Sequence, residues 1–218
     1  MNVERTTGIV LRTRPLKDTS LIVQWLTQDL GRLATVAKGA RRPKSPFRGQ
    51  IDLFHLAELS FARSRRSDLH TLREVRLLES NAALRPELAY LQQTSYCAAL
   101  IEQTTETETP LPELYAQFTA LLRELSRHPA QAATVFAFEM KLLDELGLKP
   151  DLAQTSLSAG VRQLLEKFTG DDWPALFRLR LSAAQEAEIQ KYLHGFLIYH
   201  LGKLPRARST ALAATITA

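Results

Sequence analysis

The sequence contains a single cysteine, Cys97, among its 218 residues. One thiol can form no internal disulfide, and it supplies too few ligands for a thiolate zinc site. Because disulfide-rich proteins belong to oxidising compartments, a chain almost without cysteine fits a reducing one. We therefore expect a protein of the cytoplasm.

Long hydrophobic runs are also missing. No segment approaches the roughly 20 apolar residues that a helix needs to cross a bilayer. The first residues, MNVERTTGIVLRTR, carry charge where a signal peptide needs about 7 to 15 consecutive apolar residues. We expect a protein that is not exported by a signal peptide and has no membrane partner.

The common catalytic motifs are absent as well. The chain has no phosphate-binding G-x-x-x-x-G-K-[ST], no dinucleotide-binding G-x-G-x-x-G and no zinc-binding H-E-x-x-H. His194 and His200 are six residues apart in a helical pattern, a spacing that places them on different faces of the helix. These absences predict a protein that is not an enzyme and that needs no cofactor or metal.

The composition that is present is typical of a folded protein, with 45% hydrophobic and 23% charged residues. The charge, however, is unevenly divided. Residues 1–80 hold 15 Lys and Arg against 8 Asp and Glu, a net of +7, whereas residues 81–218 hold 13 against 15, a net of −2. This asymmetry predicts an amino-terminal half that binds a polyanion and a second half of ordinary charge.

The first eighty residues read as short strands separated by turn residues. The second strand places Leu21, Val23 and Trp25 on one face. The fourth strand places Leu53, Ala57, Leu59 and Phe61 on one face. Five strands in so short a stretch indicate a small barrel of the oligonucleotide-binding (OB) type, although the periodicity allows another small barrel equally well. The predicted strands are Thr6–Arg14, Ser20–Thr27, Arg32–Gly39, Ile51–Arg63 and Leu69–Glu79.

After Ser80 the apolar residues recur at helical intervals. The predicted fold class is therefore α+β, with an OB-fold domain over residues 1–80 and an all-α domain over residues 81–218. The last stretch, RSTALAATITA, lacks a clear period and is expected to be a mobile tail. We expect helices from about Pro86 to Thr105, along the stripe Leu114–Leu125, from about Ala130 to Leu146, over Leu157–Phe168, and from a capping box at Ser182 onward.

Basic residues cluster in three places of the first domain, and such clusters indicate a groove for a phosphate backbone. A solvated basic surface is the alternative reading for any one cluster. Trp25, Phe54 and Phe61 are expected in the core, whereas Phe47 lies in a polar basic loop and is the first candidate for base stacking. The candidate DNA-binding residues are Arg12, Arg14, Lys17, Lys38, Arg41, Arg42, Lys44, Phe47, Arg48, Arg63, Arg65 and Arg66.

Charged and aromatic side chains in the helical half leave two questions open. Glu139 interrupts the apolar helix FEMKLLDEL, and it either pairs with a base from the barrel or is partly solvated. Phe136, Met140, Tyr192 and Tyr199 exceed what single apolar stripes need. They either pack in the core or line a groove for a partner peptide.

The stretch GIVLRTRPLKDTSLIVQWLTQDLGRLATVAKGARRPKS closely resembles the amino-terminal domain of the RecO family of bacterial recombination mediators. The resemblance continues through FRGQIDLFHLAEL, LHTLREVRLLES, FEMKLLDELGLKPDL and FLIYHLGKLPRARS. It implies an OB barrel followed by a helical domain. It further implies binding of single- and double-stranded DNA, annealing of complementary strands, and loading of RecA with RecR onto DNA coated by single-strand-binding protein.

One segment departs from that resemblance. Many members of the family carry a cysteine-rich zinc module after the position of LGLKPDL, whereas this chain reads AQTSLSAG there. Four ligands for a structural zinc cannot be assembled from that segment, so we expect no zinc. An RNA-binding or ribosome-associated adaptor with the same barrel is the alternative function. A nuclease would need clustered carboxylates to hold a metal, and none occurs in the basic half.

Overall fold

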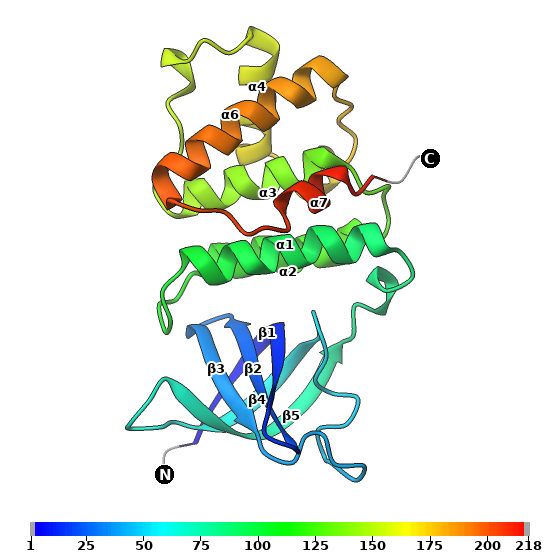
Figure 1. The fold of residues 1–218 in the computed structure, drawn as a ribbon, viewed down its shortest axis with the longest axis vertical. Coiled ribbons are helices and arrows are strands. Elements are labelled where there is room, and N and C mark those ends of the chain that lie inside the picture. Colours follow the sequence, from blue (N-terminus) through cyan, green and yellow to red (C-terminus); the bar gives the residue numbers. More distant parts are fainter. Residues whose placement is uncertain (1–2, 216–218) are drawn as a thin grey trace. The chain divides into compact units, whose positions relative to one another are not determined.

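A closed five-stranded barrel forms the amino-terminal part of the computed structural model, which describes residues 3–215. The strand order is β1-β2-β3-β5-β4, with β4 closing on β1 (Figure 1). All neighbouring strands are antiparallel except β3 and β5. This order confirms the expected OB-type barrel. The strands are β1 (Val3–Leu16), β2 (Ser20–Thr27), β3 (Gly31–Ala37), β4 (Leu56–Ala62) and β5 (Leu69–Glu79).

The long strand β1 closes the barrel because it pairs on both of its edges. Its first half, from Val3 to Ile9, pairs with β4, and its second half, from Gly8 to Leu16, pairs with β2. The register shifts between Val10 and Arg12, and such a bulge bends a strand and increases its twist. At the change of partner, a side chain on Gly8 would lie 3.1 Å from the Thr27 Cγ2 atom. The absence of a side chain there permits the close approach.

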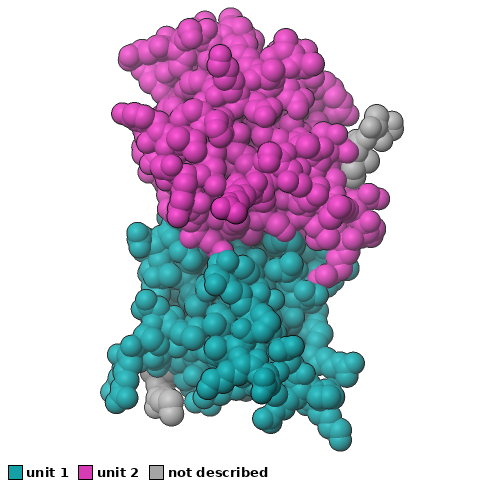
Figure 2. All heavy atoms as spheres, in the orientation of Figure 1, with its two compact units in different colours: residues 1–82, 105–119 teal, residues 83–104, 120–218 magenta. Residues whose placement is uncertain are grey.

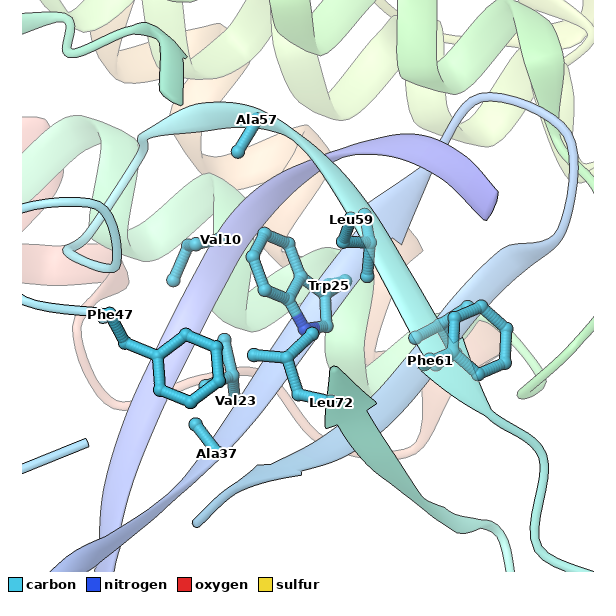
Figure 3. Packing of buried hydrophobic residues seen from close by; sticks show 10 residues of the cluster. Val10, Val23, Trp25, Ala37, Phe47, Ala57, Leu59, Phe61 and Leu72 are labelled. Carbon is cyan, nitrogen blue, oxygen red and sulfur yellow. The ribbon is translucent and has the colours of Figure 1, made fainter. Parts of the chain in front are cut away.

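The barrel interior is filled by alternating side chains, as a strand period of two requires. Val23, Trp25, Ala57, Leu59 and Phe61 are all buried in one cluster (Figure 3). The indole Nε1 of Trp25 is satisfied by the Thr35 hydroxyl at 2.8 Å. Sequence periodicity therefore predicted the inward positions Val23, Trp25, Ala57, Leu59 and Phe61 correctly. It was wrong for Leu53, which lies in a turn before β4 begins.

The fourth strand begins later than predicted, at Leu56 rather than Ile51. Residues 51–55 form a turn in which Phe54 takes a positive φ of 63°. The backbone amide of Phe54 donates to the Val10 carbonyl at 2.9 Å, and the Val10 amide donates to the His55 carbonyl at 3.0 Å. These residues therefore bond to the irregular part of β1 instead of extending β4.

The connector, residues Thr105–Leu111 between helices α1 (Leu88–Thr104) and α2 (Pro112–Leu125), packs on the barrel. Arg32 on β3 donates through Nε to the Thr105 hydroxyl at 2.8 Å, and its carbonyl accepts from the Glu108 amide at 2.7 Å. Gly31 has φ +71°, and a side chain there would lie 2.0 Å from the Thr109 carbonyl oxygen. Only glycine fits so close a backbone approach.

The chain divides into two compact units (Figure 2). The first contains the barrel up to Ala82 together with Thr105–Thr119, and the second contains Ala83–Thr104 and Ala120–Ala218. The chain thus enters the second unit, returns to the first through the connector, and leaves it again within helix α2. The division into two domains over residues 1–80 and 81–218 therefore stays a prediction. Expression of the two fragments separately would test it.

The five predicted helices lie within a few residues of their predicted positions, whereas the short helix α5 (Trp173–Leu176) was not predicted. At Ser182 the hydroxyl accepts from the Gln185 amide and the Ser182 amide donates to the Gln185 side chain, which confirms the capping box. Within residues 3–215 no helix is long and apolar enough to cross a membrane. The helices are α1 (Leu88–Thr104), α2 (Pro112–Leu125), α3 (Ala132–Glu145), α4 (Ala159–Gly170), α5 (Trp173–Leu176), α6 (Ala183–Leu201) and α7 (Arg208–Ala213), with 3-10 turns at Ala82–Leu84 and Leu152–Gln154.

Helix α3 lies at the centre of the second unit. It is buried from Ala132 through Leu143 on all sides, because α1, α4, α5, α6 and α7 all pack against it. The sequence indicated a single buried apolar stripe on this helix, whereas the whole circumference of α3 is buried. Phe136 and Met140 are fully buried and belong to the core, whereas Tyr199 on α6 is 84% exposed.

A buried ion pair fastens the last helix to the centre of the second unit. The Arg208 guanidinium donates through Nε and Nη2 to the two carboxylate oxygens of Glu139, at 2.6 and 2.8 Å. The Tyr96 hydroxyl donates to the same carboxylate at 2.5 Å. Glu139 thus pairs with a base from α7 and not from the barrel, and the alternative of partial solvation is wrong.

The expected mobile tail is an ordered helix over most of its length. Ala211 and Leu212 on α7 are buried, and the Gln93 side-chain amide donates to the carbonyls of Ala211 and Ala214 at 3.3 and 3.0 Å. The prediction of a mobile tail is therefore wrong for residues 208–213, and its last three residues lie outside the described part of the chain. Six residues are too few to show a helical period, so packing decides the structure here.

We predict that Arg208→Ala destabilises the helical unit strongly. Removal of one partner leaves the Glu139 carboxylate buried without a counter-charge, which costs about 3–5 kcal/mol in comparable pairs. Urea unfolding followed by circular dichroism measures the loss. Arg206→Ala is the control, because Arg206 is exposed and its removal should change stability by less than about 0.5 kcal/mol. Equal effects of the two substitutions would contradict the assignment.

Candidate nucleic-acid interface

The β3–β4 loop, residues 38–55, carries the densest positive charge of the barrel. The Arg41 amide donates to the Thr19 carbonyl at 2.9 Å, and its guanidinium donates to the Asp18 carbonyl at 3.2 Å. These bonds hold the loop against the β1–β2 turn, which carries Lys17. Two of the predicted basic clusters therefore meet at one end of the barrel. Their exposed members are Arg12, Arg14, Lys17, Lys38, Arg41, Arg42, Lys44 and Arg48.

The third basic cluster, Arg63, Arg65 and Arg66, lies at the other end. Strand β4 runs antiparallel to β1, so the β4–β5 loop opens opposite the β1–β2 turn. A hollow of about 720 Å³ lined by Arg63, Arg65 and Arg66 lies beside this loop. The three clusters therefore do not converge at one end. Two clusters lie at one end of the barrel and the third lies at the other.

Arg63 differs from the other basic residues because its charge is already paired. Its Nε and Nη2 atoms donate to the Glu4 carboxylate at 2.6 and 2.9 Å, and Nη1 lies 2.6 Å from the Glu108 carboxylate. The hydrogen bonds from Arg63 lower the pKa of Glu4. Partial burial raises the pKa of Glu108, but hydrogen bonds from His70 and Arg63 outweigh it and lower the pKa overall.

His70 joins the same network from strand β5. Its ring is 2% exposed and stacks on Phe61 with centroids 5.2 Å apart. The Nδ1 atom accepts from the Ser64 amide at 3.3 Å, so the proton of the neutral ring resides on Nε2, which donates to Glu108 at 2.6 Å. Sequence reasoning missed Glu4, Glu108 and His70. No local pattern connects residues so far apart in the chain.

Phe47 is buried, against the expectation that a residue of the basic loop would be available for stacking. Its side chain is 7% exposed and belongs to the barrel core cluster with Val23 and Ala37 (Figure 3). The loop folds back so that the Phe47 ring packs against the core cluster of the barrel. A ring so placed offers no face to a base, and Phe47 is not proposed further as a stacking residue.

A closed five-stranded OB-type barrel with exposed basic loops at both ends, together with a helical unit, defines an OB-fold protein. A family model described as "Recombination protein O N terminal" matches residues 1–81, and "Recombination protein O C terminal" matches residues 85–158. The chain belongs to the RecO family.

Three relatives illustrate the similarity, each named DNA repair protein RecO. The chain is 33% identical to that of Rhodopirellula baltica over 66% of its own length and 53% of the relative. The chain is 32% identical to the relative from Cyanothece sp., over 81% of its own length and 59% of the relative. It is 26% identical to the relative from Salinibacter ruber, over 99% of its own length and 95% of the relative. The matched region thus spans little more than half of the first two relatives.

We predict that Phe47→Ala destabilises the barrel by about 3–5 kcal/mol, the usual cost of removing a buried phenylalanine side chain. Thermal and urea unfolding measure the change. Phe47→Leu is the matched control, since it keeps most of the apolar volume and should cost much less. A stable Phe47→Ala protein with selectively weakened single-strand binding would restore the stacking role.

The absence of zinc stays a prediction. Within residues 3–215 the structure brings together no group of three or more His, Cys, Asp and Glu side chains suited to a metal ion. We expect elemental analysis of the purified protein to find no stoichiometric zinc, and a chelator to leave the melting temperature unchanged, because binding energy at a structural zinc site is folding energy. One zinc per chain, or a lower melting temperature with chelator, would contradict this.

Proposed function

We propose that this protein is a recombination mediator that acts in DNA repair in the cytoplasm. It binds single- and double-stranded DNA, anneals complementary strands, and with RecR helps to load RecA onto DNA coated by single-strand-binding protein. It does so by binding and without catalysing a reaction. The observation that carries the proposal is the set of exposed Arg and Lys residues at both ends of a closed OB barrel in a chain of the RecO family.

The proposed DNA path crosses the outer face of β2 and β3 between the basic loops. That face carries Ile22, Gln24, Ala34 and Val36, all half-buried. Three of these four side chains are aliphatic and cannot read the hydrogen-bonding edges of bases, whereas flexible Arg and Lys residues neutralise phosphates of any sequence. Binding is therefore expected to be strongly dependent on salt and weakly selective for sequence.

We assign the docking of RecR and single-strand-binding protein to the helical unit. Its surface includes a hollow of about 690 Å³ beside α6, lined by apolar residues such as Ile198, Leu204 and Leu212 and by the basic residues Lys191 and Arg206. Exposed apolar surface with a polar rim is typical of a protein interaction site. This hollow is the first region in which to look for partner contacts.

We predict that replacing Arg41, Arg42 and Lys44 together with alanine weakens DNA binding and slows strand annealing while leaving the melting temperature nearly unchanged. All three side chains are exposed, so they add little to stability, but each phosphate contact contributes about 0.7 to the slope of log affinity against log salt on single strands. Fluorescence anisotropy across a salt series and a strand-annealing assay measure both effects.

The same assays separate the proposal from its alternatives. Glu113 and Asp144, which are both exposed on the helices, can be replaced together as a control for unspecific effects of surface substitution. A wild-type protein with a salt-independent affinity, or with a preference for structured RNA and no annealing of DNA, would overturn the mediator function. Cleavage of labelled DNA in the presence of magnesium would indicate a nuclease instead.

A further inference from the structure

The three arginines of the β4–β5 loop have different environments. Arg65 and Arg66 are exposed, and within the described part of the chain no hydrogen bond or ion pair engages either guanidinium group. Arg63 is half-buried, and all three of its guanidinium nitrogens face carboxylates of Glu4 and Glu108. A DNA phosphate could reach Arg63 only by displacing a bidentate carboxylate, which is among the strongest partners of arginine.

The connector residue Glu108 holds both ends of this loop. Its Oε1 atom lies 2.6 Å from Arg63 Nη1, just before the loop, and 2.6 Å from His70 Nε2, just after it. The other ring nitrogen of His70 accepts from the Ser64 amide at 3.3 Å. One carboxylate oxygen of Glu108 therefore connects the end of β4 with the start of β5.

Ser64, whose amide bonds His70, also contacts residues within the loop. Its hydroxyl accepts from the Arg66 amide at 3.3 Å and lies 3.3 Å from the Ser67 hydroxyl. The loop backbone is thus bent around Ser64, and Arg65 and Arg66 project from that bend. Each restraint from Glu108 to Ser64 removes freedom that the loop would otherwise lose when it binds a ligand.

Glu108 is itself held in place by the barrel. Its backbone has a positive φ of 57°, and its amide donates to the Arg32 carbonyl of β3 at 2.7 Å. Arg32 in turn donates to the Thr105 hydroxyl and carbonyl at 2.8 and 2.6 Å. The connector is therefore fixed at Thr105 and at Glu108 itself, as a residue that orients others must be.

We propose that Glu108 and Arg63 are positioning residues, which hold the β4–β5 loop so that Arg65 and Arg66 contact DNA phosphates at the hollow beside it. This inference rests on the proposed DNA binding. It separates the roles of three arginines that the sequence places in one cluster. Arg63 orders the loop, and the phosphate contacts come from Arg65 and Arg66.

The sign of a charge-removing substitution distinguishes positioning from simple electrostatics. Glu108→Ala makes the barrel more positive, so electrostatics alone would tighten DNA binding. If Glu108 orders the loop, its removal weakens binding of a labelled oligothymidine by about three- to tenfold, the scale of one ordinary hydrogen bond. Glu58→Ala is the matched control, because Glu58 pairs with Arg76 on the same barrel and should leave affinity unchanged or slightly higher.

Arg63→Lys supplies an independent readout. Lysine keeps the charge and would serve as a phosphate contact, but it lacks the planar fork that engages Glu4 and Glu108 together. We expect Arg63→Lys to bind DNA as weakly as Arg63→Gln. Wild-type affinity of Arg63→Lys beside a weak Arg63→Gln would show that Arg63 contacts phosphate directly, and would overturn the proposal.

A double-mutant cycle completes the test. In a background with both Arg65→Gln and Arg66→Gln, Glu108→Ala should have no further effect on affinity, because the contacts that it positions are gone. An equal loss in that background, or tighter binding by Glu108→Ala alone, would overturn the positioning role. Melting temperatures of all variants identify any that are unfolded. If the folded wild-type protein binds no DNA at low salt, the proposed function itself is wrong, which is a distinct outcome.

Discussion

The two-sided pairing of β1 is the constraint on which the rest of the first unit depends. A straight strand of this length would extend roughly 46 Å. Without a bend it could not pair well with the curved neighbouring strands on both of its edges. The bulge between Val10 and Arg12 bends β1, so that it pairs first with β4 and then with β2. Because Val10 also bonds the backbone at Phe54 and His55, the same irregularity fixes the end of the long basic loop. Closure of the barrel and placement of the loop charge thus have one origin.

The basic residues of this barrel differ in whether a carboxylate neutralises them as well as in where they lie. At one end Arg41 holds the basic loop to the β1–β2 turn by donating to backbone carbonyls, which carry no net charge. At the other end Arg63 is neutralised by Glu4 and Glu108 while its neighbours Arg65 and Arg66 remain exposed. Net charge along the sequence counts all of these arginines alike, yet only exposed ones can release counterions from DNA. The connector between α1 and α2 provides Glu108, one of the two carboxylates that neutralise Arg63. This is why Arg63 differs from Arg65 and Arg66.

Sequence reasoning succeeded where local pattern decides structure. Alternation identified the inward faces around Trp25 and Leu59, and the capping box located the start of α6. It was wrong where distant contacts decide. Phe47 lies in a segment whose composition is that of a solvated turn, but packing against the barrel core buries it. Residues 208–213 are too few to show a period, and the buried carboxylate of Glu139 orders them. The site network was invisible for the same reason, because His70 and Glu108 are 38 residues apart.

The pairing of Glu139 with Arg208 has a consequence for the order in which the chain matures. The two residues are separated by 69 positions, and bacterial and eukaryotic ribosomes add about 5–20 residues per second. Glu139 is therefore made roughly 3–14 s before the base that neutralises it. During that interval α3 cannot be enclosed without burying an uncompensated carboxylate, so the helical unit completes its core only after α7 has been synthesised. The strands of the barrel precede this step, and its last packing segment, Thr105–Thr119, is complete before Glu139 is reached.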